Sequence, residues 1–158
     1  ALAGLRDLRW RLDIVGDLER APDYVGTLRS MIGNAGLESR VVLRGGIERP
    51  DLEACWQRTH IYVAASLHEG YGMAVAEAIA RGVPTVTTRA GAIGDWLDPK
   101  AALVVKPGSV EELRGALARV ISDAALREQL RQAAQEQAAH LPTWNATARV
   151  IDEALAEI

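Results

Sequence analysis

Short apolar segments alternate with longer segments of mixed polarity along the first two thirds of the chain. The apolar segments are rich in Val, Ile and Leu, and they predict strands at 11–15, 40–43, 61–65, 84–88 and 102–105. The segments between them predict helices at 22–33, 50–58 and 73–80, with a glycine loop and a short helix within 90–97. This alternation is typical of α/β proteins, so we expect a doubly wound parallel sheet of about five strands with helices on both faces.

Two segments refine this picture. The segment 61–65 is uncharged and almost continuously apolar, which predicts a central strand that is covered on both faces. The segment 1–9 has a leucine at every third position from Leu2 to Leu8, which predicts the remnant of an amphipathic helix.

After residue 108 the pattern is that of helices alone. Ser109 precedes Glu112 by three residues, which predicts a capping box at the start of a helix. A second helix is expected to begin at Ser122 or Asp123. A last helix is expected to begin at a Thr143 cap and to bury one apolar stripe, which consists of Trp144, Ile151 and Leu155.

The stretch 66–82 stands out from the rest of the chain. It opens with the glycine loop 68–72 and continues into the segment 73–80, which is apolar except for Glu77. A helix that is apolar on every side is normally buried. A buried carboxylate without a partner is costly, so Glu77 requires an explanation.

The geometry of a helix N-terminus supplies one interpretation. A helix that begins at Gly72 offers free backbone N–H groups and partial positive charge to an anion. Gly70 and Gly72 leave the backbone bare, so a ligand can approach closely. Glu69 and Glu77 would flank the anion and accept hydrogen bonds from hydroxyl groups, and a diphosphate with a sugar on each side fits that description. The alternative is a helix in which Glu77 pairs with a core arginine and Glu69 is merely solvated.

Composition and charge limit the function further. The formal net charge is −3, which gives no support for nucleic-acid binding. The single cysteine, Cys55, excludes an internal disulfide and is expected to be a small buried residue in a reducing, cytoplasmic compartment. No apolar run is long enough to span a bilayer. No paired His or Cys spacing and no Asp-x-Asp motif is present, so we expect no metal ion and no cofactor.

The spacing of Glu69 and Glu77 around Gly-Tyr-Gly resembles the signature of the group-1, retaining, nucleotide-sugar-dependent glycosyltransferases with two Rossmann-like domains, the GT-B fold. The resemblance implies that residues 1–158 form the C-terminal, donor-binding domain. It also implies an enzyme that transfers a sugar from a nucleotide diphosphate donor to an acceptor hydroxyl. In such an enzyme Glu69 would contact hydroxyls of the donor sugar, as the catalytic carboxylate, and Glu77 would bind the ribose.

Further residues match the family pattern. The resemblance implies backbone N–H groups for the diphosphate and the sugar at Gly70, Tyr71, Gly72, Met73 and Ala74. It implies a position near the nucleotide for Gly16 and contacts to the base for Gly46 and Ile47. Arg44 is a candidate phosphate clamp, and its alternative is a solvated surface charge. For His68 we favour a histidine hydrogen-bonded to backbone over a catalytic base.

The sequence departs from the family in two places. Residues 91–95 read Gly-Ala-Ile-Gly-Asp where relatives read Gly-Gly-Ile-Pro-Glu, so we assign no donor contacts there. The family's Gly-Arg-Leu-x-x-x-Lys-Gly segment, which clamps the diphosphate, is absent together with the strand that leads into it. We therefore expect a fragment that lacks this strand, the clamp and the N-terminal acceptor domain.

The missing strand leads to a structural expectation. A sheet without it would expose two unpaired edges, which favours association between copies. Our hypothesis is that the gap is closed by direct pairing of strands 11–15 and 61–65, or by a strand from another copy. The parent protein would meet its acceptor through the missing domain, with peripheral membrane association through that same domain.

Two other classes of function remain open at this point. One is an interaction module that kept the fold without catalysis, and the other is a nucleotide-sugar epimerase or hydrolase on the same two-domain fold. The base of the nucleotide, the donor sugar and the acceptor are not determined by these residues.

Overall fold

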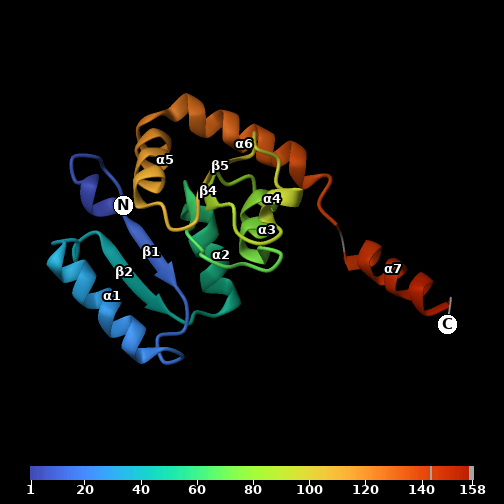
Figure 1. Cartoon of the computed structure of the whole chain (residues 1–158), viewed down its shortest axis with the longest axis horizontal. Helices are drawn as coiled ribbons and strands as arrows, with labels where there is room; N and C mark the ends of the chain where they lie inside the picture. The colour runs from blue at the N-terminus through green and yellow to red at the C-terminus, as the bar shows by residue number, and fades with distance from the viewer. Residues whose placement is uncertain (143, 157–158) are drawn as a thin grey trace.

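The computed structural model describes residues 1–142 and 144–156 (Figure 1). Its strands are all parallel, which confirms the α/β fold class, but they form two sheets instead of one. In the first sheet, β1 (Leu12–Val15) pairs with β2 (Val41–Gly45). The second sheet has the order β3-β4-β5, which are Tyr62–Ala64, Thr85–Thr88 and Ala102–Val105.

Helices connect and follow the strands at the positions that the sequence predicts. They are α1 (Pro22–Asn34), α2 (Arg49–Arg58), α3 (Met73–Ala80), α4 (Ile93–Trp96), α5 (Val110–Ser122), α6 (Ala124–Ala138) and α7 (Trp144–Ala156). The prediction of a helix remnant at the N-terminus is wrong, because that segment forms only a short 3-10 turn, Leu2–Gly4.

Side chains cap the N-termini of α5 and α6. Ser109 Oγ accepts a hydrogen bond from the backbone N–H of Glu112, at 3.3 Å, at the start of α5. The reciprocal half of the capping box does not form, because the Glu112 carboxylate accepts from the Lys106 N–H instead. Asp123 caps α6 by accepting from the N–H of Leu126, so that helix begins after Asp123 and not at Ser122.

The last helix does not bury the stripe that the sequence predicts. Ile151 and Leu155 are 54% and 63% exposed, and Figure 1 shows α7 projecting away from the body that contains the sheets. An amphipathic helix buries its apolar face only where another element lies against it. The cap expected at Thr143 and the side chain of Trp144 lie outside the described residues.

The centre of the core is β4. All four of its residues are buried, and apolar side chains cover it on both faces. One face packs against a cluster that includes Val75, Ile79 and Ile93, and the other packs against a cluster that includes Leu117 and Val120. The threonine hydroxyls in this strand are paired within the protein, as buried polar groups must be.

The strand expected to be central is an edge strand instead. In β3, Tyr62 and Val63 are only half-buried, and no strand among the described residues pairs with its free side. Strands β1 and β3 do not pair with each other, so direct closure of the gap is wrong for the described structure. In Figure 1, β1 lies between β2 and the part of the molecule that holds β4 and β5. Each sheet therefore keeps an unpaired backbone edge.

The glycine loop after β3 is anchored on the turn after β4. The Thr88 hydroxyl donates to the Ser66 carbonyl at 2.6 Å, and the Ala92 N–H donates to the Gly70 carbonyl at 3.0 Å. Gly91 lies directly against this loop with a φ of +56°, and a Cβ there would come within 1.7 Å of the Glu69 carbonyl oxygen. Only glycine satisfies both demands.

We expect Gly91→Ala to lower the free energy of unfolding by more than about 1 kcal/mol, because alanine is strained at positive φ and its Cβ displaces the loop. Urea unfolding followed by circular dichroism measures this change. Gly115→Ala is the matched control: Gly115 lies inside α5 and a Cβ there meets nothing within 4 Å, so stability should stay equal or rise. Equal stability of Gly91→Ala and the original chain would contradict the anchoring of the loop.

Candidate functional site

The glycine turns gather at the carboxyl ends of the parallel strands, where α/β sheets bind their ligands. They form two groups. The loops after β1 and β2 are joined by a hydrogen bond from the Gly16 N–H to the Gly45 carbonyl, at 3.0 Å. The loop after β3 lies on the turn that contains Gly91. The sequence analysis places its candidate residues in these same turns.

The N-terminus of α3 is open. Gly72 caps the helix in the left-handed conformation, with φ +85°, and no side chain caps its first turn. A Cβ at Gly72 would lie 2.7 Å from Cγ1 of the buried Ile93, so the turn requires glycine. Met73 and Ala74, which begin the helix, are exposed. The first-turn N–H groups therefore face a space that no side-chain cap occupies.

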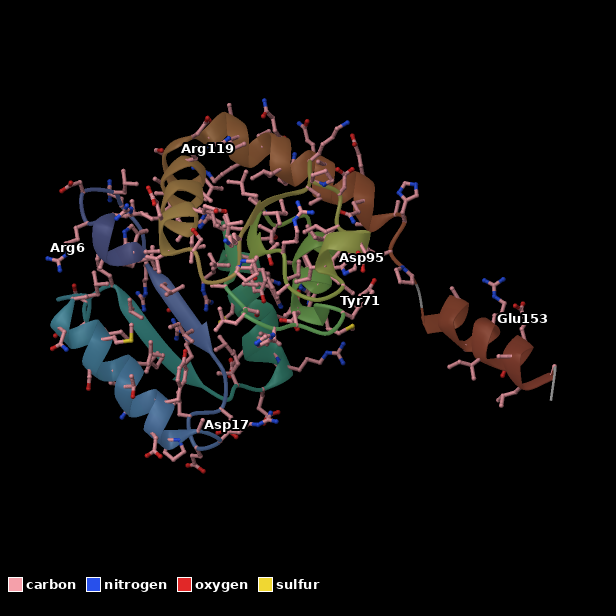
Figure 2. The ribbon with its side chains drawn as sticks, viewed as in Figure 1. Arg6, Asp17, Tyr71, Asp95, Arg119 and Glu153 are labelled. Carbon is pink, nitrogen blue, oxygen red and sulfur yellow. The ribbon has the colours of Figure 1, made fainter. Side chains whose placement is uncertain are left out.

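Tyr71 is held beside this open end. Its ring stacks on that of Trp96, with the ring centroids 5.3 Å apart and an angle of 15° between the planes. The Trp96 Nε1–H donates to the Tyr71 carbonyl at 2.8 Å. Figure 2 labels Tyr71 close to Asp95, which belongs to the same short helix α4 as Trp96. The loop before α3 is thus fixed by α4 as well as by the turn after β4.

Glu69 is half-buried in this loop and has one oxygen occupied. The Ser66 hydroxyl donates to Glu69 Oε2 at 2.9 Å, which orients the carboxylate and leaves Oε1 available as an acceptor. The neighbouring His68 is exposed, and the described residues offer its ring no hydrogen bond. The backbone partner expected for His68 is therefore wrong.

Glu77 is not a buried carboxylate, so that expectation is wrong as well. Helix α3 buries Val75, Ala78 and Ile79 on one side and leaves the opposite side open, and the Glu77 side chain is 43% exposed. Its partner is Arg81, whose Nη2 lies 3.1 Å from Glu77 Oε1. This arginine is itself one-third exposed and is not a core residue. Glu77 therefore has an arginine partner and still reaches solvent.

Tyr62 links the two carboxylates. Burial raises the pKa of the Tyr62 hydroxyl, and the negative charges of Glu69 and Glu77 raise that pKa further. Both carboxylates thus act on one tyrosine, which is the first residue of β3. Sequence reasoning did not single out Tyr62, because a tyrosine within an apolar strand has no pattern that separates it from other core residues.

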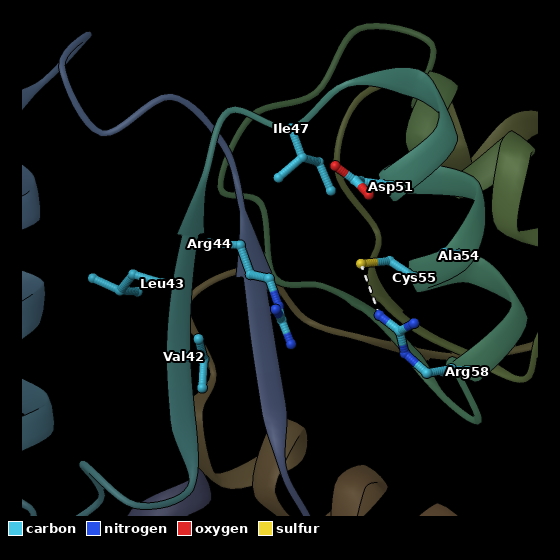
Figure 3. A pocket seen from close by; sticks show the side chains of 8 residues that line it. All are labelled: Val42, Leu43, Arg44, Ile47, Asp51, Ala54, Cys55 and Arg58. Carbon is cyan, nitrogen blue, oxygen red and sulfur yellow. Dashed lines mark hydrogen bonds between the residues drawn. The ribbon is translucent and has the colours of Figure 1, made fainter.

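A cavity of about 470 Å³ lies between β2 and α2 (Figure 3). It contains two of the predicted residues, Arg44 and Ile47, on the β2 side. On the α2 side it is lined by Asp51, Ala54, Cys55 and Arg58, which sequence reasoning did not assign to a site. The prediction of a buried Cys55 is wrong, because this residue is half-buried at the cavity wall and accepts a 3.6 Å contact from Arg58.

Arg44 is paired within the protein. Its Nη2 donates to Asp13 Oδ2 at 3.1 Å, and this hydrogen bond and the carboxylate charge raise the pKa of the guanidinium. Arg44 therefore joins β2 to β1 at the edge of the cavity, and a phosphate would have to share it with Asp13.

The described residues contain neither a metal-binding cluster nor a membrane-spanning helix. No group of three His, Cys, Asp or Glu side chains within 1–142 and 144–156 is arranged to hold a metal ion. In the same residues, no helix has both the length and the apolar character needed to cross a bilayer.

The chain is similar to known proteins over almost its whole length. It is 27% identical over 157 residues to the MMP alpha-(1->4)-mannosyltransferase of Mycolicibacterium hassiacum, covering 96% of this chain and 38% of that protein. It matches the structure of Anabaena Alr3699/HepE in complex with UDP with a TM-score of 0.86 and 25% identity, over 99% of this chain and 44% of that one.

A third match has a comparable length. The C-terminal domain of the group 1 family protein LpcC from Francisella tularensis superposes with a TM-score of 0.71 and 21% identity, over 83% of this chain and 85% of that domain. The chain spans between 30% and 38% of the length of the first curated relatives that it matches. It therefore corresponds to one part of these larger proteins.

The family model described as "Glycosyl transferases group 1" matches residues 1–137, which include both glutamates and the whole glycine loop. The chain belongs to the group 1 glycosyltransferases.

Proposed function

We propose that this chain is the donor-binding domain of a retaining glycosyltransferase that moves a sugar from a nucleotide diphosphate donor to an acceptor hydroxyl. The observation that carries this proposal is the open N-terminus of α3, with Glu69 in the loop before it and Glu77 on the helix itself. The family membership and the match to a UDP-bound relative support the same conclusion.

The diphosphate binds at the N-terminus of α3. The N–H groups of the first turn have no side-chain cap, and the helix dipole favours negative charge there. Gly70 is exposed and has open space around it, so a phosphate can approach its backbone closely. The remaining N–H groups assigned to the diphosphate and the sugar belong to Tyr71, Gly72, Met73 and Ala74.

The two carboxylates bind hydroxyl groups on either side of the diphosphate. Glu69 keeps Oε1 free for hydroxyls of the donor sugar, while Ser66 holds its other oxygen. Glu77 keeps Oε2 free and is 43% exposed, so a ribose can reach it. Hydrogen bonds to a charged acceptor contribute more than neutral ones, about 1.5–3 kcal/mol each.

The base lies toward the cavity between β2 and α2. Gly46 and Ile47 follow β2, and Ile47 lines this cavity together with Arg44. The Gly16 N–H donates to the Gly45 carbonyl, so Gly16 lies beside the end of β2. In this proposal Gly16 is next to the nucleotide. The structures of Alr3699/HepE with UDP and with UDP-glucose support a uridine nucleotide as the first candidate to test.

Catalysis in the parent enzyme is electrostatic. As the bond between the sugar and the diphosphate breaks, negative charge grows on the leaving phosphate, and the α3 N–H groups stabilise it. The leaving diphosphate takes the proton of the acceptor hydroxyl, so the protein needs no dedicated base. No metal ion takes part in this proposal, because the sequence has no Asp-x-Asp motif.

The proposal also includes parts outside residues 1–158. An additional parallel strand, from a longer form of the protein or from another copy, pairs with the free edges of β1 and β3. The half-buried state of β3 supports this, as does the buried Trp56 Nε1–H, which has no acceptor among the described residues. An acceptor domain, a cytoplasmic location and peripheral contact of that domain with a membrane complete the proposal.

Titration of the chain with UDP, GDP and ADP and with their sugars tests the donor site. We expect millimolar, NMR-detectable binding of one nucleoside diphosphate, and we expect Glu77→Ala to weaken it by about tenfold or more, because the ribose loses hydrogen bonds to a carboxylate. Glu69→Ala should weaken binding of the nucleotide sugar but leave the affinity for the free nucleoside diphosphate unchanged. EDTA should change neither affinity.

Glu136→Ala is the control for these substitutions, because this glutamate is exposed on α6 and belongs to none of the proposed binding groups. An interaction module without a donor site would show no binding, and Glu77→Ala would then change nothing. That pair of results would overturn the proposed function.

The isolated chain should transfer no sugar, since the diphosphate clamp and the acceptor domain are not part of it. Incubation with the nucleotide sugar that binds best, followed by mass spectrometry of the products, measures this. Steady turnover with an acceptor, or release of product without one, would show that residues 1–158 hold a complete active site and would contradict this division of the enzyme.

A further inference from the structure

Arg81 occupies a junction between α3 and α2. Its Nη2 lies 2.8 Å from Glu53 Oε2 on α2 and 3.1 Å from Glu77 Oε1 on α3. Its guanidinium carbon lies 5.4 Å from the centroid of the Trp56 ring, also on α2. A single side chain therefore contacts three others, and one of these is the carboxylate assigned to the ribose.

We propose that Arg81 is a positioning residue for donor binding, which sets the orientation of Glu77 and ties it to α2. The inference rests on the proposed role of Glu77 toward the ribose. Arg81 itself does not touch the nucleotide in this proposal. It acts through the carboxylate that it holds.

The local sequence favours the pair. Glu77 precedes Arg81 by four residues, so the two side chains lie on the same face of α3, in the order that stabilises a helix best. Arg81 is the C-cap residue of α3, where a positive charge also interacts favourably with the helix dipole. The pair is therefore formed before any ligand arrives.

The pair leaves room for a ligand. Arg81 contacts only Oε1 of Glu77, and a carboxylate offers about four acceptor positions on its two oxygens. Glu77 Oε2 and the remaining position on Oε1 can accept both ribose hydroxyls. Because one oxygen is already held, less rotational freedom of the side chain is lost when the ribose binds.

The contacts with α2 anchor the Glu77–Arg81 pair on the helix that lines the cavity assigned to the base. Helix α2 lines the cavity assigned to the base through Asp51 and Cys55, while its Glu53 and Trp56 hold Arg81. Arg81 thus fixes the position of the Glu77 carboxylate relative to α2.

Arginine suits this junction better than lysine. A planar guanidinium presents several donors at once and stacks on an aromatic ring, so it can serve two carboxylates and an indole together. A lysine ammonium keeps the charge but lacks the planar fork. Arg81→Lys should therefore preserve only part of the effect.

The test compares UDP, GDP and ADP with their 2′,3′-dideoxy counterparts, which lack the hydroxyls that Glu77 binds. In the original chain, the ratio of the two affinities measures the contribution of the ribose hydroxyls. We expect Arg81→Met to lower this ratio by about two- to fivefold, the effect of a partly exposed ion pair, without changing the affinity of the dideoxy nucleotide. Arg81→Lys should recover part of the ratio.

Two further variants separate positioning from a merely structural role. Adding Arg81→Met to Glu77→Ala should cause no additional loss, because the arginine acts through that carboxylate. Arg131→Met is the matched control, since it removes a comparable exposed pair, Arg131 with Glu128 on α6, and should leave the ratio unchanged. If Arg81→Met does not fold in urea-unfolding measurements, Glu53→Gln replaces it, because it weakens only the α2 contact and should lower the ratio less.

An unchanged ratio in Arg81→Met, or in Glu53→Gln when it serves as the substitute, overturns this inference. An equal loss of affinity for the ribo and dideoxy nucleotides does so as well, since that would indicate a general effect on folding. If Glu77→Ala abolishes the ratio and Arg81→Met does not change it, only this inference fails. If the original chain shows no preference for the ribose hydroxyls, the proposed function fails, and this inference with it.

Discussion

The structure depends on the contact between the glycine loop after β3 and the turn after β4. Gly91 must be glycine because its φ is positive and the Glu69 carbonyl occupies the space of a Cβ. Gly72 must be glycine because its φ is positive and Ile93 occupies the corresponding space there. These two positions determine where the loop ends and where α3 begins. As a result, the first turn of α3 has free N–H groups and no side chain in front of them.

Two carboxylates near this turn, those of Glu69 and Glu77, are each held by a neighbouring group. Glu69 is held by a hydroxyl within its own loop, whereas Glu77 is held by an arginine one turn along its own helix. Neither carboxylate is fully buried, so neither requires a partner for every oxygen. An anionic ligand at the helix end would bring hydroxyls to both, while the backbone N–H groups neutralise part of its charge. In the proposed function, the groups that meet the charged ligand are thus already oriented before it binds.

The unpaired sheet edges explain most of the differences between the expected and the observed fold. The apolar pattern of 61–65 correctly predicts a strand, but its burial depends on a neighbour that the described residues do not supply. Strand β4 has neighbours on both sides and is buried throughout. The same reason applies to α7, whose exposed residues Ile151 and Leu155 form an apolar stripe with no element against it in Figure 1. A pattern predicts which face can be buried, and only packing decides whether it is.

The sequence by itself determined the order of strands and helices, the start of α3 at Gly72 and the family to which Glu69 and Glu77 point. These features depend on spacing and on local backbone chemistry, which a short segment carries with it. Tertiary structure alone decided that Glu77 stays exposed, that Arg81 joins it to Glu53 and Trp56, and that Arg44 is engaged by Asp13. The contacts of Arg81 with α2 and of Arg44 with Asp13 join residues distant in the sequence. Whether Glu77 is covered likewise depends on which elements pack beside α3, and no local pattern records that.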